Sequence, residues 1–99
     1  MSVAQIVSIT PKSGREADVE GLLRRLVDGA RREEGTLLYV LNRRDDGFVL
    51  YEMYADEDAM TVHNGNPALH ELVGRAAELL AAGVKAERVS YLDGTAELR

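Results

Sequence analysis

The stretch TLLYVLNRRDDGFVLYEMYA, residues 36–55, holds two runs of aliphatic, aromatic and β-branched residues on either side of a short polar segment. Such runs are typical of β-strands. Asp46 and Gly47 stand between the runs, and an Asp-Gly pair is among the strongest local signals for a tight hairpin. We therefore predict two antiparallel neighbouring strands, residues 36–44 and 48–55.

Both predicted strands are apolar on both faces. Successive side chains of a strand point to opposite faces, so the first strand would show Leu37, Tyr39 and Leu41 on one face and Leu38 and Val40 on the other. A sheet covered by helices on one side only normally alternates apolar and polar residues. Because the chain has too little helix to cover two faces, we expect the open face to pack against a second copy in a two-fold homodimer.

The hairpin register remains open at this point. A two-residue loop and a three-residue loop around Asp46 and Gly47 both fit the sequence, and changing from one to the other reverses the face on which each side chain lies. The residues that share a pocket face therefore cannot be assigned from the sequence.

Upstream of the hairpin, VAQIVSIT at residues 3–10 predicts a strand that stops at Pro11. Ser13 and Glu16 then have the spacing of a capping box, and apolar residues recur at helical spacing up to Ala30. This pattern predicts an amphipathic helix of about 20 residues, with Gly35 as its natural stop.

Downstream, DEDAMTVH at residues 56–63 predicts a short helix, and NGNP interrupts it. Asn66 is expected to cap a new helix that has Pro67 at its first position. This helix would end at Gly83 and bury its apolar face, which is formed by Leu69, Leu72, Val73, Ala76 and Leu80. Residues 84–92 return as a last strand, and residues 93–99 form a polar tail.

The element order β-α-β-β-α(α)-β predicts an α+β fold, the ferredoxin-like sandwich, with one antiparallel sheet and helices on one of its faces. A chain of 99 residues corresponds to one domain, which we expect to span residues 1–99.

Composition narrows the function classes. The formal charge is −5, from 17 acidic and 12 basic side chains, and such a field disfavours nucleic acid and anionic membrane surfaces as partners. The sequence has no Cys, no secretion signal and no apolar run of the roughly 20 residues that a bilayer span needs. We expect a compact cytoplasmic protein.

The run EEGTLLYVLNRRDDGFVLYEMYADEDAMTVH, together with NPALHEL, resembles the antibiotic biosynthesis monooxygenase family. The family pattern has the form G-(small or apolar)-L-x-Y, then F-x-x-Y-E-x-Y/W-x-D-x-x-A-x-x-x-H. The matching positions in this sequence are Gly35, Leu37 or Leu38, Tyr39, Phe48, Tyr51, Glu52, Tyr54, Asp56, Ala59 and His63.

The resemblance implies a small ferredoxin-like dimer that adds oxygen from O₂ to phenolic or quinol-like polycyclic compounds without metal or flavin. Relatives instead degrade haem, isomerise small sugar-like signals, or have no known activity. A cofactor-free monooxygenase is thus the first hypothesis. A non-catalytic dimer that binds an aromatic metabolite and an isomerase on the same scaffold are the alternatives.

His63 falls on the histidine of the family pattern and is expected to point inward. An imidazole titrates near neutrality, so it could accept a proton or a hydrogen bond from a substrate hydroxyl. It could equally be a core histidine whose partner is Glu52 or a backbone carbonyl. Glu52 likewise could tune His63 or the substrate, or it could anchor the hairpin or the dimer contact. The sequence leaves both questions open.

For an oxygenase, the substrate-binding candidates are Asn42 and Tyr51 as orienters, Arg43 as a partner of the oxyanion, and Tyr39 as a stacking or hydrogen-bonding residue. Haem chemistry is disfavoured by comparison with the haem-degrading relatives. Those relatives have a Trp at the position that His63 occupies in this chain. They also bind the haem iron through a histidine at the position of Val73. A metal site from His63 and His70 is also disfavoured because a helix break separates them, and no metal or other cofactor is expected.

Overall fold

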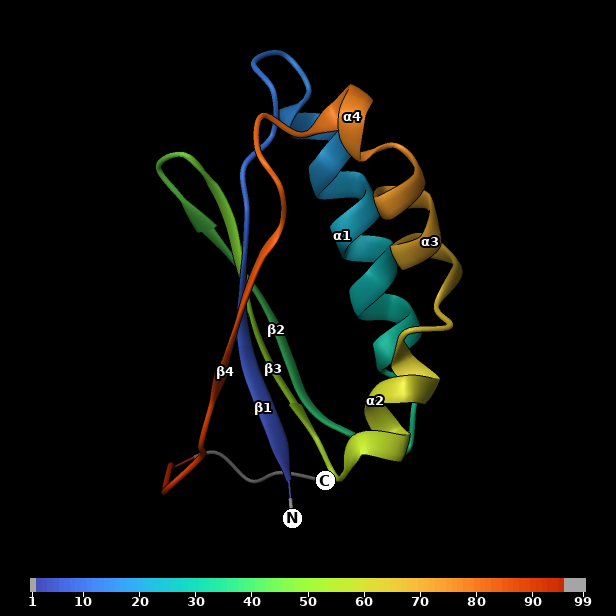
Figure 1. The fold of residues 1–99 in the computed structure, drawn as a ribbon, viewed down its shortest axis with the longest axis vertical. Helices are drawn as coiled ribbons and strands as arrows, with labels where there is room; N and C mark the ends of the chain where they lie inside the picture. The colour runs from blue at the N-terminus through green and yellow to red at the C-terminus, as the bar shows by residue number, and fades with distance from the viewer. Residues whose placement is uncertain (1, 96–99) are drawn as a thin grey trace.

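The computed structural model describes residues 2–95 and arranges them as one antiparallel sheet with the helices on one of its faces (Figure 1). In chain order the elements are β1 (Val3–Ile9), α1 (Glu16–Ala30), β2 (Thr36–Arg44), β3 (Gly47–Tyr54), α2 (Glu57–His63), α3 (Pro67–Gly74), α4 (Ala76–Leu79) and β4 (Lys85–Val89). The strands lie in the order β2-β3-β1-β4. This confirms the predicted ferredoxin-like α+β fold.

The hairpin register is that of a two-residue loop. Arg44 pairs with Gly47, so Asp45 and Asp46 alone connect β2 and β3, and Gly47 is the first residue of β3. A Cβ on Gly47 would lie 2.2 Å from the carbonyl oxygen of Ile9, so the neighbouring strand leaves no space for a side chain there. In this register Tyr39 lies opposite Glu52.

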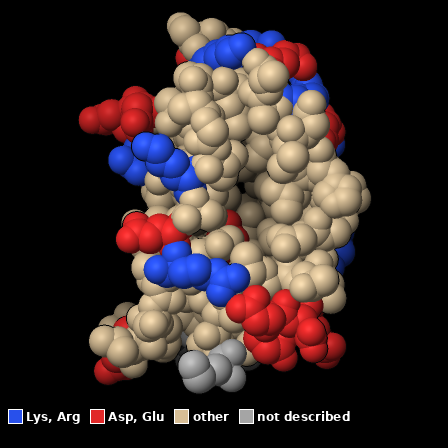
Figure 2. Space-filling view, in the orientation of Figure 1, with Lys and Arg blue, Asp and Glu red and all other residues tan. Residues whose placement is uncertain are grey.

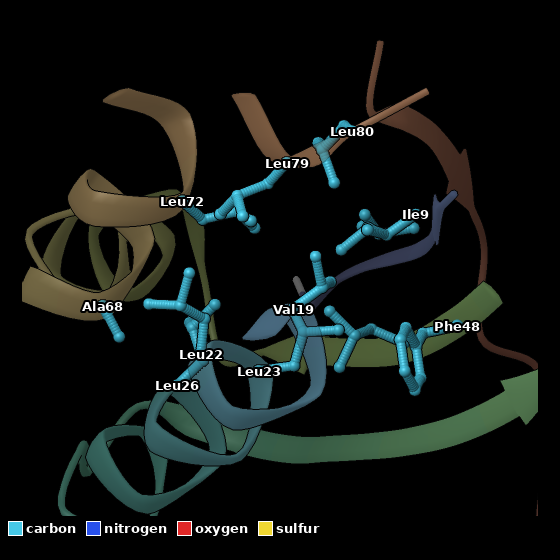
Figure 3. Packing of buried hydrophobic residues seen from close by; sticks show 12 residues of the cluster. Ile9, Val19, Leu22, Leu23, Leu26, Phe48, Ala68, Leu72, Leu79 and Leu80 are labelled. Carbon is cyan, nitrogen blue, oxygen red and sulfur yellow. The ribbon is translucent and has the colours of Figure 1, made fainter. Parts of the chain in front are cut away.

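The core fills the space between the helix-facing side of the sheet and α1 and α3. Figure 3 shows Leu22, Leu23 and Leu26 of α1 lying between Leu72 of α3 and the sheet. Complete burial of one such side chain stabilises the fold by about 2 kcal/mol. The buried cluster consists of Val7, Ile9, Val19, Leu22, Leu23, Leu26, Phe48, Leu50, Ala68, Leu72, Leu79 and Leu80.

The first helix differs from its prediction at both ends. It has 15 residues and begins at Glu16, and its N-cap is Arg15 without a side-chain cap. The predicted capping box with Ser13 is wrong, because the chain turns at Gly14, which has a φ of 85° and donates its N–H to the Glu16 carboxylate. The helix ends at Ala30, so Gly35 is not its stop.

The second predicted helix is divided. Asn66 does cap α3, with its side chain accepting from the N–H of Ala68, and Pro67 occupies the first turn. The helix ends at Gly74 and restarts as α4, because Arg75 leaves helical geometry at φ −107° and ψ 13°. Val73 was predicted to be buried, but 65% of its surface is exposed, which corrects that part of the pattern.

The C-terminal strand is shorter than expected. It covers Lys85–Val89, and all five of its residues are exposed at the edge of the sheet. Of the predicted polar tail, residues 96–99 lie outside the described part of the chain. No helix within residues 2–95 combines the length and apolar character needed to cross a lipid bilayer.

The sheet face away from the helices is apolar, as the sequence indicated. In β2 and β3 the register places Leu38, Val40, Val49, Tyr51 and Met53 on this face, although Val49 and Met53 are already buried within the single chain. Val40 is 37% exposed and Tyr51 is 46% exposed in the single chain. We call this surface the open face.

Candidate active site

A cavity of about 170 Å³ lies between the sheet and the helices. Most of its lining is aliphatic, and its polar side chains include Gln5, Tyr39, Glu52 and His63. Its rim includes exposed residues of α3 and of the segment leading into β4. In Figure 2 the molecule is hollowed between its sheet side and its helix side, and the helix side of this hollow is uncharged. The site therefore has a polar wall within an apolar enclosure.

His63 stands at the last position of α2 and is only 2% exposed. Asp56 fixes the start of this short helix, because its side chain accepts from the N–H of Ala59 at 2.8 Å. The Nδ1 atom of His63 lies 2.8 Å from Oε1 of Glu33. An ionised carboxylate can only accept, so Nδ1–H donates and Nε2 is left as the basic nitrogen.

Glu33 belongs to the turn between α1 and β2, and its side chain is 14% exposed. Thr36 donates its hydroxyl to the same Oε1 at 2.8 Å, which holds the carboxylate in place. The turn lies close to α2, because a Cβ on Gly35 would approach the Cβ of Ala59 to 2.4 Å. Glycine at this position lets α2 and His63 come within reach of Glu33.

Two tyrosines hold the imidazole in its orientation. The ring centroids of Tyr39 and Tyr54 lie 4.7 Å and 5.3 Å from that of His63, and both rings are tilted to it. Burial raises the pKa of both phenols, and the neighbouring Glu52 carboxylate raises it further. Both hydroxyls therefore stay protonated near neutral pH and act as hydrogen-bond donors.

Glu52 is 5% exposed and lies on the helix-facing side of β3. Its Oε1 accepts from the amide of Gln5 at 2.8 Å and from the hydroxyl of Tyr54 at 2.5 Å. Glu52 therefore does not lie on the open face, which is the opposite side of the sheet. The partner of His63 is also neither Glu52 nor a backbone carbonyl, but Glu33.

Three of the predicted substrate-binding residues lie away from this cavity. The two-residue loop turns Asn42 and Tyr51 to the open face, where the Asn42 amide lies 3.4 Å from two backbone carbonyls of the sheet. Arg43 lies in an outer groove between α1 and β2, where it donates to Glu20 at 2.5 Å and covers the ring of Phe48. Tyr39 and Glu52 are the two candidates that the structure brings to His63.

His70 is exposed, and its Nε2 lies 2.9 Å from the carbonyl oxygen of Asn64. Within residues 2–95, no three His, Cys, Asp or Glu side chains are grouped so that they could hold a metal ion.

Sequence reasoning missed Gln5 and Glu33. Gln5 could have been found, since it is the one polar residue in the alternating series Val3, Gln5, Val7 and Ile9 on the inner face of β1. Glu33 gave no signal, because it lies 30 residues before His63 in a turn rich in charged residues.

The chain is similar to several solved structures. It shares 28% identity with Rv0793 from Mycobacterium tuberculosis, over 97% of this chain and 100% of the other, with a TM-score of 0.85. It shares 26% identity with PA3566 from Pseudomonas aeruginosa, over 93% and 95%, at a TM-score of 0.82. A protein of unknown function from Nitrosomonas europaea, NE2512, is 25% identical over 97% and 94%, at a TM-score of 0.84.

No curated protein matches the chain. Residues 2–75 match the family described as antibiotic biosynthesis monooxygenase, and this segment contains the hairpin, α2 and every polar residue named above on the cavity wall. The chain belongs to the antibiotic biosynthesis monooxygenase family.

Proposed function

We propose that the protein is a cofactor-independent monooxygenase that acts on a phenolic or quinol-like aromatic substrate. The observation that carries this proposal is the buried imidazole of His63, which lines the cavity and has the carboxylate of Glu33 bound to its Nδ1. A carboxylate that fixes the tautomer of an imidazole is the arrangement by which enzymes prepare a general base. Membership of the family supports the reaction class.

In the first step Nε2 of His63 takes a proton from a substrate hydroxyl or an acidic ring carbon. Glu33 stabilises the imidazolium that forms, as a buried carboxylate does for the histidine of a catalytic triad. Glu52 would oppose the developing negative charge on the substrate, so its role is to accept a hydrogen bond from a second hydroxyl that stays protonated. The protonated phenol of Tyr39, which lies beside Glu52, would turn its single O–H from that carboxylate to the new oxyanion.

The deprotonated substrate then supplies the four electrons that reduce O₂. It passes one electron to O₂, and the resulting superoxide and substrate radical combine to form a carbon–oxygen bond. The peroxide releases water and leaves a carbonyl, so a benzenediol and O₂ give a hydroxyquinone and H₂O. The protein contributes the base, the donors and a cavity that excludes water.

Oxygen uptake tests this function. The protein is mixed with aromatic diols and anthrones of one to three rings, and the rate is corrected for spontaneous autoxidation. We expect at least one compound to be oxidised faster with the protein than without it. No acceleration for any compound would refute the oxygenase, and tight binding without uptake would favour the non-catalytic binding protein.

We further propose that the protein is a homodimer that buries the open face. A cluster that includes Leu38, Val40 and Tyr51 is more apolar than a sheet face that meets only water. Two copies related by a two-fold axis would cover it on both sheets.

A further inference from the structure

We infer that the substrate has a single six-membered aromatic ring and carries no anionic group. This inference rests on the proposed function, whose substrate class it narrows. Three observations lead to it: the size of the cavity, the position of its rim and the charges on its wall.

The cavity holds one ring. Its volume is about 170 Å³, and an apolar protein cavity of about 150 Å³ accommodates one benzene molecule. Pockets for larger organic ligands begin at roughly 300 Å³. Leu26, Leu50 and Leu72 form part of the wall and are almost fully buried in the core, so the space cannot widen without repacking.

A second fused ring would have to pass the rim. Val73 and Val84 stand there, with 65% and 44% of their surfaces exposed. An additional ring would have to lie beyond the enclosed volume, with one face on these side chains and the other in solvent. It would therefore add less affinity than the enclosed first ring.

The wall repels anions. Glu52 lines the cavity, Glu33 lies behind His63, and neither Lys nor Arg is among the described residues of the lining. A carboxylate on the ligand would be placed beside Glu52 at low effective dielectric without a counter-ion. Hydroxyl groups fit instead, since they can donate to Glu52 and to Nε2 of His63 while the ring contacts the aliphatic end of the cavity.

Anaerobic binding measurements test this inference separately from oxygenation. Methylhydroquinone is compared with gentisate, which has a carboxylate in place of the methyl group. It is also compared with 1,4-dihydroxynaphthalene, which has a second fused ring. Calorimetry under argon gives each affinity. We expect methylhydroquinone to bind at least about tenfold more tightly than either other compound, which is one decade of Kd.

A variant provides the complementary test. Leu69 lines the cavity and is only partly buried, so Leu69→Ala enlarges the space with little loss of core. It should raise the affinity for 1,4-dihydroxynaphthalene about tenfold. Val62→Ala, on the exposed side of α2, is the matched control and should change nothing. If Leu69→Ala does not fold, the three compounds on the native protein decide.

Equal or tighter binding of gentisate or 1,4-dihydroxynaphthalene to the native protein would overturn the inference, and so would the absence of binding by methylhydroquinone. Selective binding of methylhydroquinone without oxygen uptake would support the inference and refute the oxygenase. Uptake that is as fast with two-ring as with one-ring diols would refute the inference and leave the oxygenase standing.

Discussion

Replacement of Glu33 by Gln tests the proposed base most directly. The substitution Glu33→Gln keeps the size of the side chain and an oxygen that can accept from Nδ1 of His63, but it removes the negative charge. Ground-state packing should therefore change little. What is lost is the stabilisation of the imidazolium that forms when His63 takes the proton of the substrate.

The size of the loss follows from the geometry. Oε1 of Glu33 and Nδ1 of His63 are 2.8 Å apart. With the two charges spread over their groups, their centres are about 4 Å apart, and at an effective dielectric constant of about 20 they attract by about 4 kcal/mol. A transition state with the proton half transferred feels about half of this, and each 1.36 kcal/mol is a factor of ten. We expect the rate to fall by about 30-fold for a half-transferred proton, and by up to about 1,000-fold for a transition state in which transfer is complete.

The assay is oxygen uptake with the best diol, corrected for autoxidation, with thermal melting of each protein measured in parallel. Glu34→Gln is the control, because this neighbour is exposed and the same charge is removed. His63→Gln should lower the rate by about 10²- to 10⁴-fold. Equal rates for Glu33→Gln and Glu34→Gln would show that the carboxylate of Glu33 does not assist catalysis. Unchanged uptake by His63→Gln with a lower melting temperature would make His63 a structural residue.

Four further predictions concern assembly, packing, acid stability and composition. Sedimentation at micromolar concentration should give twice the chain mass of 10.9 kDa, and Val40→Glu on the open face should give the single mass. Gly35→Ala should lower the free energy of unfolding by about 1–3 kcal/mol in urea melts, because its Cβ would meet α2, whereas Gly21→Ala, which has open space, should not. The guanidinium of Arg75 lowers the pKa of Glu78 from 4.5 to about 2. The stabilising effect of this carboxylate is therefore present above pH 4.5 and is lost as the pH falls towards 2. Over that range the melting temperatures of Glu78→Gln and of the native protein should converge. Elemental analysis and an absorption spectrum should show no stoichiometric metal, flavin or haem in the purified protein, and any of these would contradict the cofactor-free reaction.

The fold was predictable because its signals are local. The apolar runs flanking Asp46 and Gly47 indicate the hairpin without any knowledge of the rest of the chain, and Asn66 with Pro67 marks the start of α3. Helix ends were less predictable. The capping box at Ser13 failed because Gly14 takes a left-handed turn, a backbone choice that the spacing of Ser and Glu does not specify.

The site was predictable only in part. His63 and Glu52 could be nominated from a motif, and the cavity includes both. The residues that reach them from elsewhere depend on three-dimensional geometry. Glu33 meets His63 across a sequence separation of 30, and Asn42 and Tyr51 were misplaced because one residue in the loop length decides which face they occupy.

The alternation along β3 has a consequence for how this chain can vary during evolution. Leu50 and Glu52 line the cavity, whereas Val49, Tyr51 and Met53 lie on the open face. Insertion or deletion of one residue within the strand would exchange the two sets at once, placing a carboxylate on the surface and a valine, tyrosine or methionine beside the imidazole. Substitutions can be accepted one at a time here, but changes in length cannot. Natural variation in this segment is therefore expected to conserve its length more strictly than its residues.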